Sequence, residues 1–162
     1  MINFTVSGID QAKRALEQEI KKLTTNKTVL VGIHEGAGLT DDGDLTMAQL
    51  GAVLHFGTDR AGKNNSVTIP ARPWLDVGVK SGISDYIEII QNHSDNLDNA
   101  LEIIGQVATG KVQMYMTDLN APANADSTTA KKGSSNPLID TGALRQSVTY
   151  SISPDMPKEG LS

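Results

Sequence analysis

The feature that most constrains the fold is a long helical pattern from Ile83 to Leu119. Apolar residues recur there every three or four positions, which places them on one face of an α-helix. This stripe comprises Leu97, Leu101, Ile104, Ala108, Val112, Tyr115 and Leu119. Polar residues at 92–96 interrupt the pattern, so we expect a short helix, a break and then the long helix. Gly105 and Gly110 either weaken the long helix or let a neighbouring element approach it closely.

Alternating and β-branched runs predict three strands. Ile2, Phe4 and Val6 alternate with polar residues, as in a half-buried strand. Residues 27–33 form a β-branched run that predicts a strand buried on both faces. Residues 148–152 alternate again and predict the last strand.

Shorter helices are expected between these strands. Asp10 can cap a helix whose apolar face comprises Ala12, Leu16, Ile20 and Leu23. Thr46 can cap a second helix that ends at Phe56-Gly57, where glycine would supply a left-handed cap. A third begins after Pro73. Residues 34–44 and 57–66 are interpreted as polar loops.

These elements predict an α+β fold in which a small mixed or antiparallel sheet packs against a long helix, with extended loops and arms. We expect one domain over residues 1–153 and a loose tail over 154–162. Only 38% of the residues are hydrophobic and 4% are aromatic, so the core should be aliphatic and modest.

The most unusual segment is a polar arm at residues 120–137, which holds almost nothing that could enter a core. Compact domains rarely keep an arm of this length unless a partner orders it. It leads into the apolar residues Leu138, Ile139 and Leu144, which we expect to anchor its end on the core. The arm therefore favours a protein that works through contacts with other chains.

Composition excludes several classes of protein and of site. The chain has no cysteine, which excludes disulfides and thiolate zinc sites. A net charge of −5 argues against a general nucleic-acid binder. No apolar run reaches membrane-spanning length, and the first residues lack the pattern of a signal peptide. No phosphate-binding loop or other cofactor motif is present.

Asp140-Thr141-Gly142 matches the tripeptide of aspartic proteases. Such an enzyme needs two facing carboxylates and several strands after the catalytic residue, and too little chain follows here. We therefore expect Asp140 or Thr141 to cap a short helical turn at residues 142–147. We assign no catalytic, cofactor-binding or metal-binding residues. The acidic cluster of Asp41, Asp42 and Asp44 lacks the spacing of a calcium loop and is interpreted as a solvated turn.

Three segments in order resemble a known family: AQLGAVLHFGT at 48–58, IPARPW at 69–74 and PLIDTGALR at 137–145. The chain resembles the virion-morphogenesis proteins of tailed bacteriophages, the neck and tail-completion proteins that include protein G of phage Mu and the minor tail protein Z of lambdoid phages. The likeness covers residues 1 to about 153. That family more commonly has phenylalanine at the position of Trp74. The tryptophan keeps an aromatic anchor there.

The resemblance implies a non-enzymatic virion protein at the head–tail junction, assembled in the host cytoplasm. It implies a homo-oligomeric ring, expected to be a hexamer, that joins the tail to the head. The implied partners are head-completion, connector and tail-tube proteins, with DNA passing through the lumen without specific binding and no membrane. The resemblance leaves open whether the chain is a tail terminator, a tail-completion protein or a connector ring. The alternatives from other classes are a hydrolase using Asp140 and a small DNA-binding accessory factor.

Neighbouring subunits of a ring must present unlike, complementary faces. We expect the interface to come from loops 34–44, 57–66 and 120–137, and the acidic segment 34–58 could meet the basic N-terminal helix. Trp74 should be at least half-buried, and Arg72 should meet a carboxylate or backbone carbonyls. The arm should bring Lys131 and Lys132 near an acidic surface. The proposed interface residues are Arg72, Trp74, Lys131, Lys132, Asp41, Asp42 and Asp44.

Overall fold

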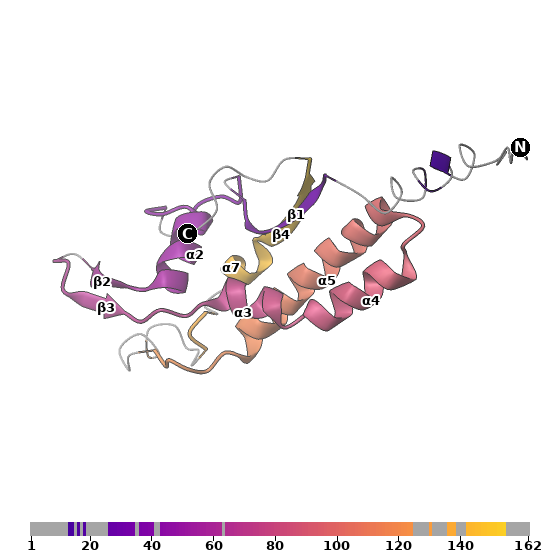
Figure 1. Ribbon diagram of the computed structural model, residues 1–162. Helices are drawn as coiled ribbons and strands as arrows, with labels where there is room; N and C mark the ends of the chain where they lie inside the picture. Colours follow the sequence, from indigo (N-terminus) through magenta and orange to yellow (C-terminus); the bar gives the residue numbers. More distant parts are fainter. Residues whose placement is uncertain are drawn as a thin grey trace, which may run out of the picture.

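The computed structural model describes residues 13, 14, 16, 18, 26–34, 36–40, 43–62, 64–124, 130, 136–138 and 142–154. Figure 1 shows an α+β arrangement in which short strands lie beside a group of helices. In chain order the elements are β1 (Thr28–Ile33), α2 (Met47–Phe56), β2 (Thr58–Ala61), β3 (Val67–Ile69), α3 (Trp74–Lys80), α4 (Ile83–Asn92), α5 (Leu97–Asp118), α7 (Ala143–Gln146) and β4 (Val148–Ser153). The predicted α+β class is confirmed, with two small antiparallel sheets.

The first sheet joins the two ends of the described chain. Strand β1 pairs antiparallel with β4, from Thr28 opposite Ser153 to Ile33 opposite Val148. Helix α5 contacts both strands. The strand predicted at 27–33 is confirmed, but its expected burial on both faces is wrong, because every residue of β1 is only half-buried. A sheet of two strands beside one long helix leaves part of each strand open.

The predicted pair of helices over residues 83–119 is confirmed, with the break where the sequence placed it. Asn96 caps α5, since its side chain accepts a hydrogen bond from the Asn99 amide at 3.1 Å. The buried residues of α5 are Ala100, Gly105, Ala108, Val112 and Met116. The predicted stripe is therefore confirmed as the covered side of α5, since Ala108 and Val112 are buried and its other members are half-buried. Its most buried line also takes in the small residues Ala100 and Gly105, because α3 and the sheet approach that side of the helix.

Glycines allow those close approaches. A methyl group at Gly105 would overlap the ring of Tyr150 on β4, and one at Gly78 of α3 would lie 2.8 Å from the Cα atom of Val112. Gly110 faces open space. Of the two roles considered for the α5 glycines, close packing is therefore correct for Gly105 and not for Gly110.

Helix α2 begins as predicted. The Thr46 side chain accepts from the Gln49 amide at 3.1 Å, and the Gln49 side chain accepts from the Thr46 amide at 2.9 Å, which is a capping box. Gly57 ends the helix with a φ of 73°, but its ψ of 172° lies outside the left-handed helical region expected there. Helix α3 begins directly after Pro73, as predicted.

The polar loop expected at residues 57–66 is instead a hairpin. Strands β2 and β3 pair antiparallel, with Thr58 opposite Ile69 and Ala61 opposite Val67. Gly62 and Asn65 have positive φ angles of 77° and 51°, as tight turns require. The hairpin reaches away from the helices (Figure 1).

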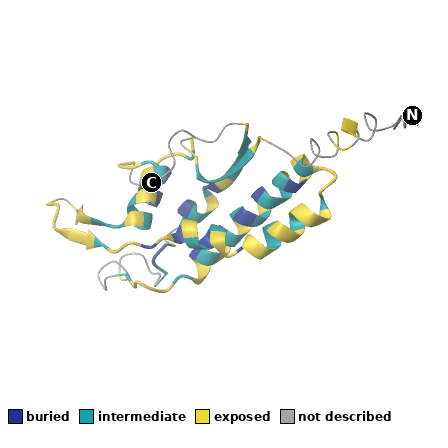
Figure 2. Cartoon of the chain, viewed as in Figure 1, coloured by how far each residue is buried: buried dark blue, intermediate teal, exposed yellow. Residues whose placement is uncertain are grey.

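The core joins both halves of the chain. It comprises Met47, Trp74, Val112, Met116, Leu138, Leu144 and Val148, as the dark blue segments of Figure 2 indicate. Leu138 and Leu144 are 3% and 6% exposed, which confirms their predicted anchoring role. The N-cap of α7 is Gly142, at φ 84° and without a side-chain cap. Ile139, Asp140 and Thr141, which include the expected capping residues, lie outside the described residues.

Other predictions also fall outside the described residues. They are the strand at residues 2–6, most of the helix at 10–23, residues 125–129 and 131–135 of the arm, and the tail from residue 155. Within residues 10–23 the structure describes Lys13, Arg14, Leu16 and Gln18, all helical and exposed.

Candidate functional site

The most highly connected polar group among the described residues is the guanidinium of Arg72, which is 2% exposed. Its Nε atom donates to the Pro122 carbonyl at 3.0 Å, and its Nη2 atom donates to the Ala123 carbonyl at 3.2 Å. Longer contacts of 3.4 Å reach the Asn124 side-chain oxygen and the Pro70 carbonyl. Arg72 therefore meets backbone carbonyls within its own chain, one of the two kinds of partner predicted for it.

Short-range geometry explains how Arg72 reaches these carbonyls. Prolines at positions 70 and 73 hold the segment of residues 69–73, which contains Arg72, in an extended conformation. The Arg72 amide donates to the Leu54 and His55 carbonyls at 3.0 and 3.2 Å, which ties the segment to the end of α2. Burial lowers the pKa of Arg72 from its usual value, but an arginine side chain remains protonated, so its hydrogen bonds are charge-assisted.

Asn136 holds the returning end of the arm. Its side-chain amide donates to the Thr117 and Met116 carbonyls at 2.8 and 3.2 Å, at the C-terminal end of α5. Its side-chain oxygen accepts from the Leu138 amide at 2.9 Å. The Asn124 side chain donates to the Asn136 carbonyl at 3.4 Å and so joins the two ends. We call this group of Arg72, residues 122–124 and Asn136 the arm base.

Trp74 secures the arm base to the core. It is 3% exposed, which confirms the predicted burial, and its indole nitrogen donates to the Gly51 carbonyl at 3.1 Å. Arg145, from the family-like segment at 137–145, donates to the Thr117 hydroxyl at 3.1 Å. Residues of the segments at 69–74 and 137–145 therefore converge on the C-terminal end of α5 and on the roots of the arm. Asn124 and Asn136 were not singled out from the sequence, because asparagines in a polar segment carry no pattern.

Thr40 and residues 43–45, the described residues around the acidic cluster, form a turn, which we call the acidic turn. The Thr40 amide donates to the Leu45 carbonyl at 2.8 Å, and the Gly43 amide donates to the Thr40 carbonyl at 2.8 Å. Asp44 is exposed on this turn. Asp41, Asp42, Lys131 and Lys132 lie outside the described residues.

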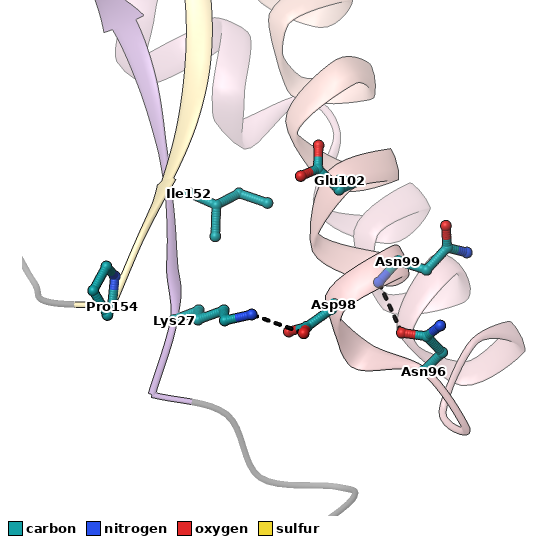
Figure 3. Close-up of a pocket in the computed structure, with 7 residues that line it drawn as sticks. All are labelled: Lys27, Asn96, Asp98, Asn99, Glu102, Ile152 and Pro154. Atoms are coloured by element: carbon teal, nitrogen blue, oxygen red, sulfur yellow. Dashed lines mark hydrogen bonds and ion pairs between the residues drawn. The ribbon is translucent and has the colours of Figure 1, made fainter.

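A polar cavity of about 460 Å³ lies beside the N-terminal end of α5 (Figure 3). Lys27 and Asp98 form an ion pair of 2.7 Å there, with side chains 40% and 64% exposed, so the pair stabilises the fold only slightly. Glu102 accepts a hydrogen bond from the Tyr150 hydroxyl at 3.0 Å. Among the residues that the structure describes, no group of three or more His, Asp or Glu side chains could hold a metal ion.

An apolar cavity of about 220 Å³ opens between α2 and α3, with Gly51, His55, Phe56 and Trp74 in its wall. His55 stacks edge-on against Trp74 with ring centroids 5.9 Å apart. Its Nδ1 atom is buried and has no hydrogen-bond partner within the described part of the chain. Burial lowers the pKa of His55 and Asp76 opposes the shift, so the imidazole is neutral near pH 7.

Large apolar side chains also lie on the surface. Leu39, Phe56 and Val67 are 60%, 54% and 51% exposed near the acidic turn and the hairpin. A separate set lies on α4 and consists of Ile83, Ile87 and Ile90. The spacing of that second set is visible in the sequence, but its exposure depends on which side of α4 faces the body.

No helix in the described part of the chain is both long and apolar enough to cross a membrane. The chain matches no protein-family model. No curated protein and no solved structure matches it either, so the resemblance to phage neck and tail-completion proteins remains a prediction.

Proposed function

We propose that the protein is a non-enzymatic structural component of a tailed-bacteriophage particle, at the head–tail junction, where copies of it form a ring that joins the tail to the head. A hexamer is the ring order that the family resemblance favours. Its neighbours would be head-completion or connector proteins and tail-tube proteins, with DNA passing through the lumen. The observation that carries this proposal is the arm base.

The arm base supports the proposal because it fixes both roots of a segment that has no core of its own. Arg72 holds residues 122–124, and Asn136 holds the returning end. Between them the sequence consists of small and polar residues, chiefly Ser, Thr, Ala and Lys. Such a segment cannot bury enough apolar surface to offset its ordering entropy, about 1–2 kcal/mol per residue for the backbone. A polar loop with anchored roots is suited to contact a neighbouring chain.

The charges of the loops suggest how that contact is oriented. Lys131 and Lys132 belong to the arm, while Asp41, Asp42 and Asp44 form the acidic cluster in the sequence. In the proposed ring the two lysines of one copy meet the acidic turn of the next. This contact joins two different surfaces, as a closed head-to-tail ring requires. Arg72 and Trp74 act indirectly in it, since both are buried within their own subunit and position the arm.

Shortening the arm tests the proposal. A variant that lacks residues 125–133 keeps every contact of the arm base, so it should fold with an unchanged circular dichroism spectrum. The native mass of the intact protein should be a multiple of the 17.2 kDa protomer, whereas the shortened variant should remain a monomer. A charge-reversed variant of full length, Lys131→Glu with Lys132→Glu, serves as the matched control and should weaken assembly without changing the arm length.

Other results would overturn the proposal. Shortened protein that still completes infectious particles would exclude an essential role for the arm. Intact protein that stays monomeric and is missing from purified virions would exclude the ring. Retention on a phosphate column that weakens with salt would favour the DNA-binding alternative instead.

A further inference from the structure

Helix α4 carries a row of exposed isoleucines. Ile83, Ile87 and Ile90 are 52%, 52% and 44% exposed, and their spacing of four and three residues aligns them along the helix. Tyr86, on another side of α4, is half-buried and donates to the Val79 carbonyl at 2.9 Å. The isoleucine row is therefore not the side that holds α4 to the body, and Figure 2 shows the exposed flank of this helix.

The isoleucine row lies in an acidic stretch. Between residues 81 and 110 the chain has five acidic residues and no lysine or arginine. Asp85 pairs with Lys111 at 2.7 Å, and Asp98 pairs with Lys27 at 2.7 Å. Glu88 and Asp95 have no ionic partner among the residues that the structure describes. A fitting partner would therefore present an apolar helical row flanked by positive charge.

The N-terminal helix of the same chain has these properties. Its predicted apolar face comprises Ala12, Leu16, Ile20 and Leu23. Leu16 is 61% exposed, so this face is uncovered where the structure describes it. Lys13 and Arg14 are exposed beside it. Figure 1 shows the described part of this helix apart from α4 and α5, so in this structure these residues do not cover the isoleucine row.

We propose that the isoleucine row of α4 binds the N-terminal helix, residues 10–23, of a second copy of this chain. Packing the two apolar rows removes both from water, and the lysine and arginine approach Glu88 of α4 and Asp95, which lies just beyond the end of α4. The acidic segment 34–58, the partner expected from the sequence, offers no comparable row, because Leu39 and Leu45 lie outside any helix and Phe56 is its one large exposed apolar residue on a helix among the residues that the structure describes. Each copy donates one helix and receives another, so this contact rests on the proposed self-assembly and can continue around a ring.

Cysteine cross-linking tests the contact directly, because the natural chain has no cysteine. Leu16→Cys protein and Ile87→Cys protein, one of them carrying a mass tag, are mixed and oxidised. A mixed disulfide-linked pair should form, since a disulfide requires the two Cα atoms to lie within about 7 Å. Gln18→Cys provides the matched control, because Gln18 is also exposed and, two residues from Leu16, faces a different side of a helix. It should yield roughly tenfold less cross-linked pair with Ile87→Cys.

Three results would overturn this proposal: no mixed pair, equal yields from the Leu16 and Gln18 variants, or a double Leu16→Cys, Ile87→Cys protein that closes the disulfide only within one chain. Failure here is distinguishable from failure of the proposed function. A mixed pair in protein whose native mass never exceeds a dimer would support the helix contact and overturn the ring. A full ring without the mixed pair would support the ring and overturn this contact.

Discussion

Replacing Arg72 by lysine should release the arm while leaving the core intact. The substitution keeps the positive charge and most of the aliphatic stem. It removes the planar fork that reaches the Pro122 and Ala123 carbonyls together, at 3.0 and 3.2 Å. A lysine ammonium can occupy one of these positions but not both in the same geometry.

The loss can be estimated from these contacts. A hydrogen bond to a charged group contributes about 1.5–3 kcal/mol. Pro122 and Ala123 are exposed, so water can replace part of what a lost donor supplied, and the lower half of that range applies. We expect the free energy of unfolding to fall by about 2 kcal/mol. For a chain of 162 residues this lowers the melting temperature by about 4–8 °C.

Thermal or urea unfolding followed by circular dichroism measures this change. Arg145→Lys is the matched control, because within the described residues Arg145 makes one side-chain hydrogen bond, to the Thr117 hydroxyl at 3.1 Å. It should cost less than about 1 kcal/mol. Limited proteolysis should also cut the Arg72→Lys arm faster than the arm of the control. Equal losses of stability and equal cutting rates in the two variants would refute the role assigned to Arg72.

Two further predictions concern stability. Gly110→Ala should raise the free energy of unfolding by about 0.5–1 kcal/mol, because its site is open and alanine favours the helix. Gly105→Ala should lower the free energy of unfolding by about 1–2 kcal/mol, because the added methyl group overlaps the Tyr150 ring. Denaturant midpoints that move in the same direction for both variants would contradict these two predictions. Burial lowers the pKa of His55 in the folded protein below its unfolded value of about 6.5, so this imidazole binds a proton more readily in the unfolded chain. The free energy of unfolding should therefore fall as the pH drops below about 6.5. A His55→Gln variant should lose part of this decline, and titration curves that superimpose with those of the natural chain would exclude His55 as its source.

Local signals in the sequence determined most of the helices. The capping box at Thr46 and the break at residues 92–96 act within a few residues, so α2, α4 and α5 could be placed from the chain alone. The same holds for β1 and β4, whose composition marks them as strands. The hairpin at residues 58–69 was missed because both strands are short and β2 is polar, although Gly62 and Asn65 are turn residues.

Only the tertiary structure decided what these elements contact. Gly105 and Gly110 look alike in the sequence, and they differ because Tyr150 crosses α5 at the first and nothing crosses at the second. Burial of β1 likewise depends on how many layers cover the sheet, which the chain composition leaves open. The arm base is the clearest case. Arg72 finds its acceptors 50 and 51 residues further along the chain, and no local propensity describes a contact over that separation. It forms because Trp74 and Leu138 enter one core and bring the roots of the arm to the end of α5.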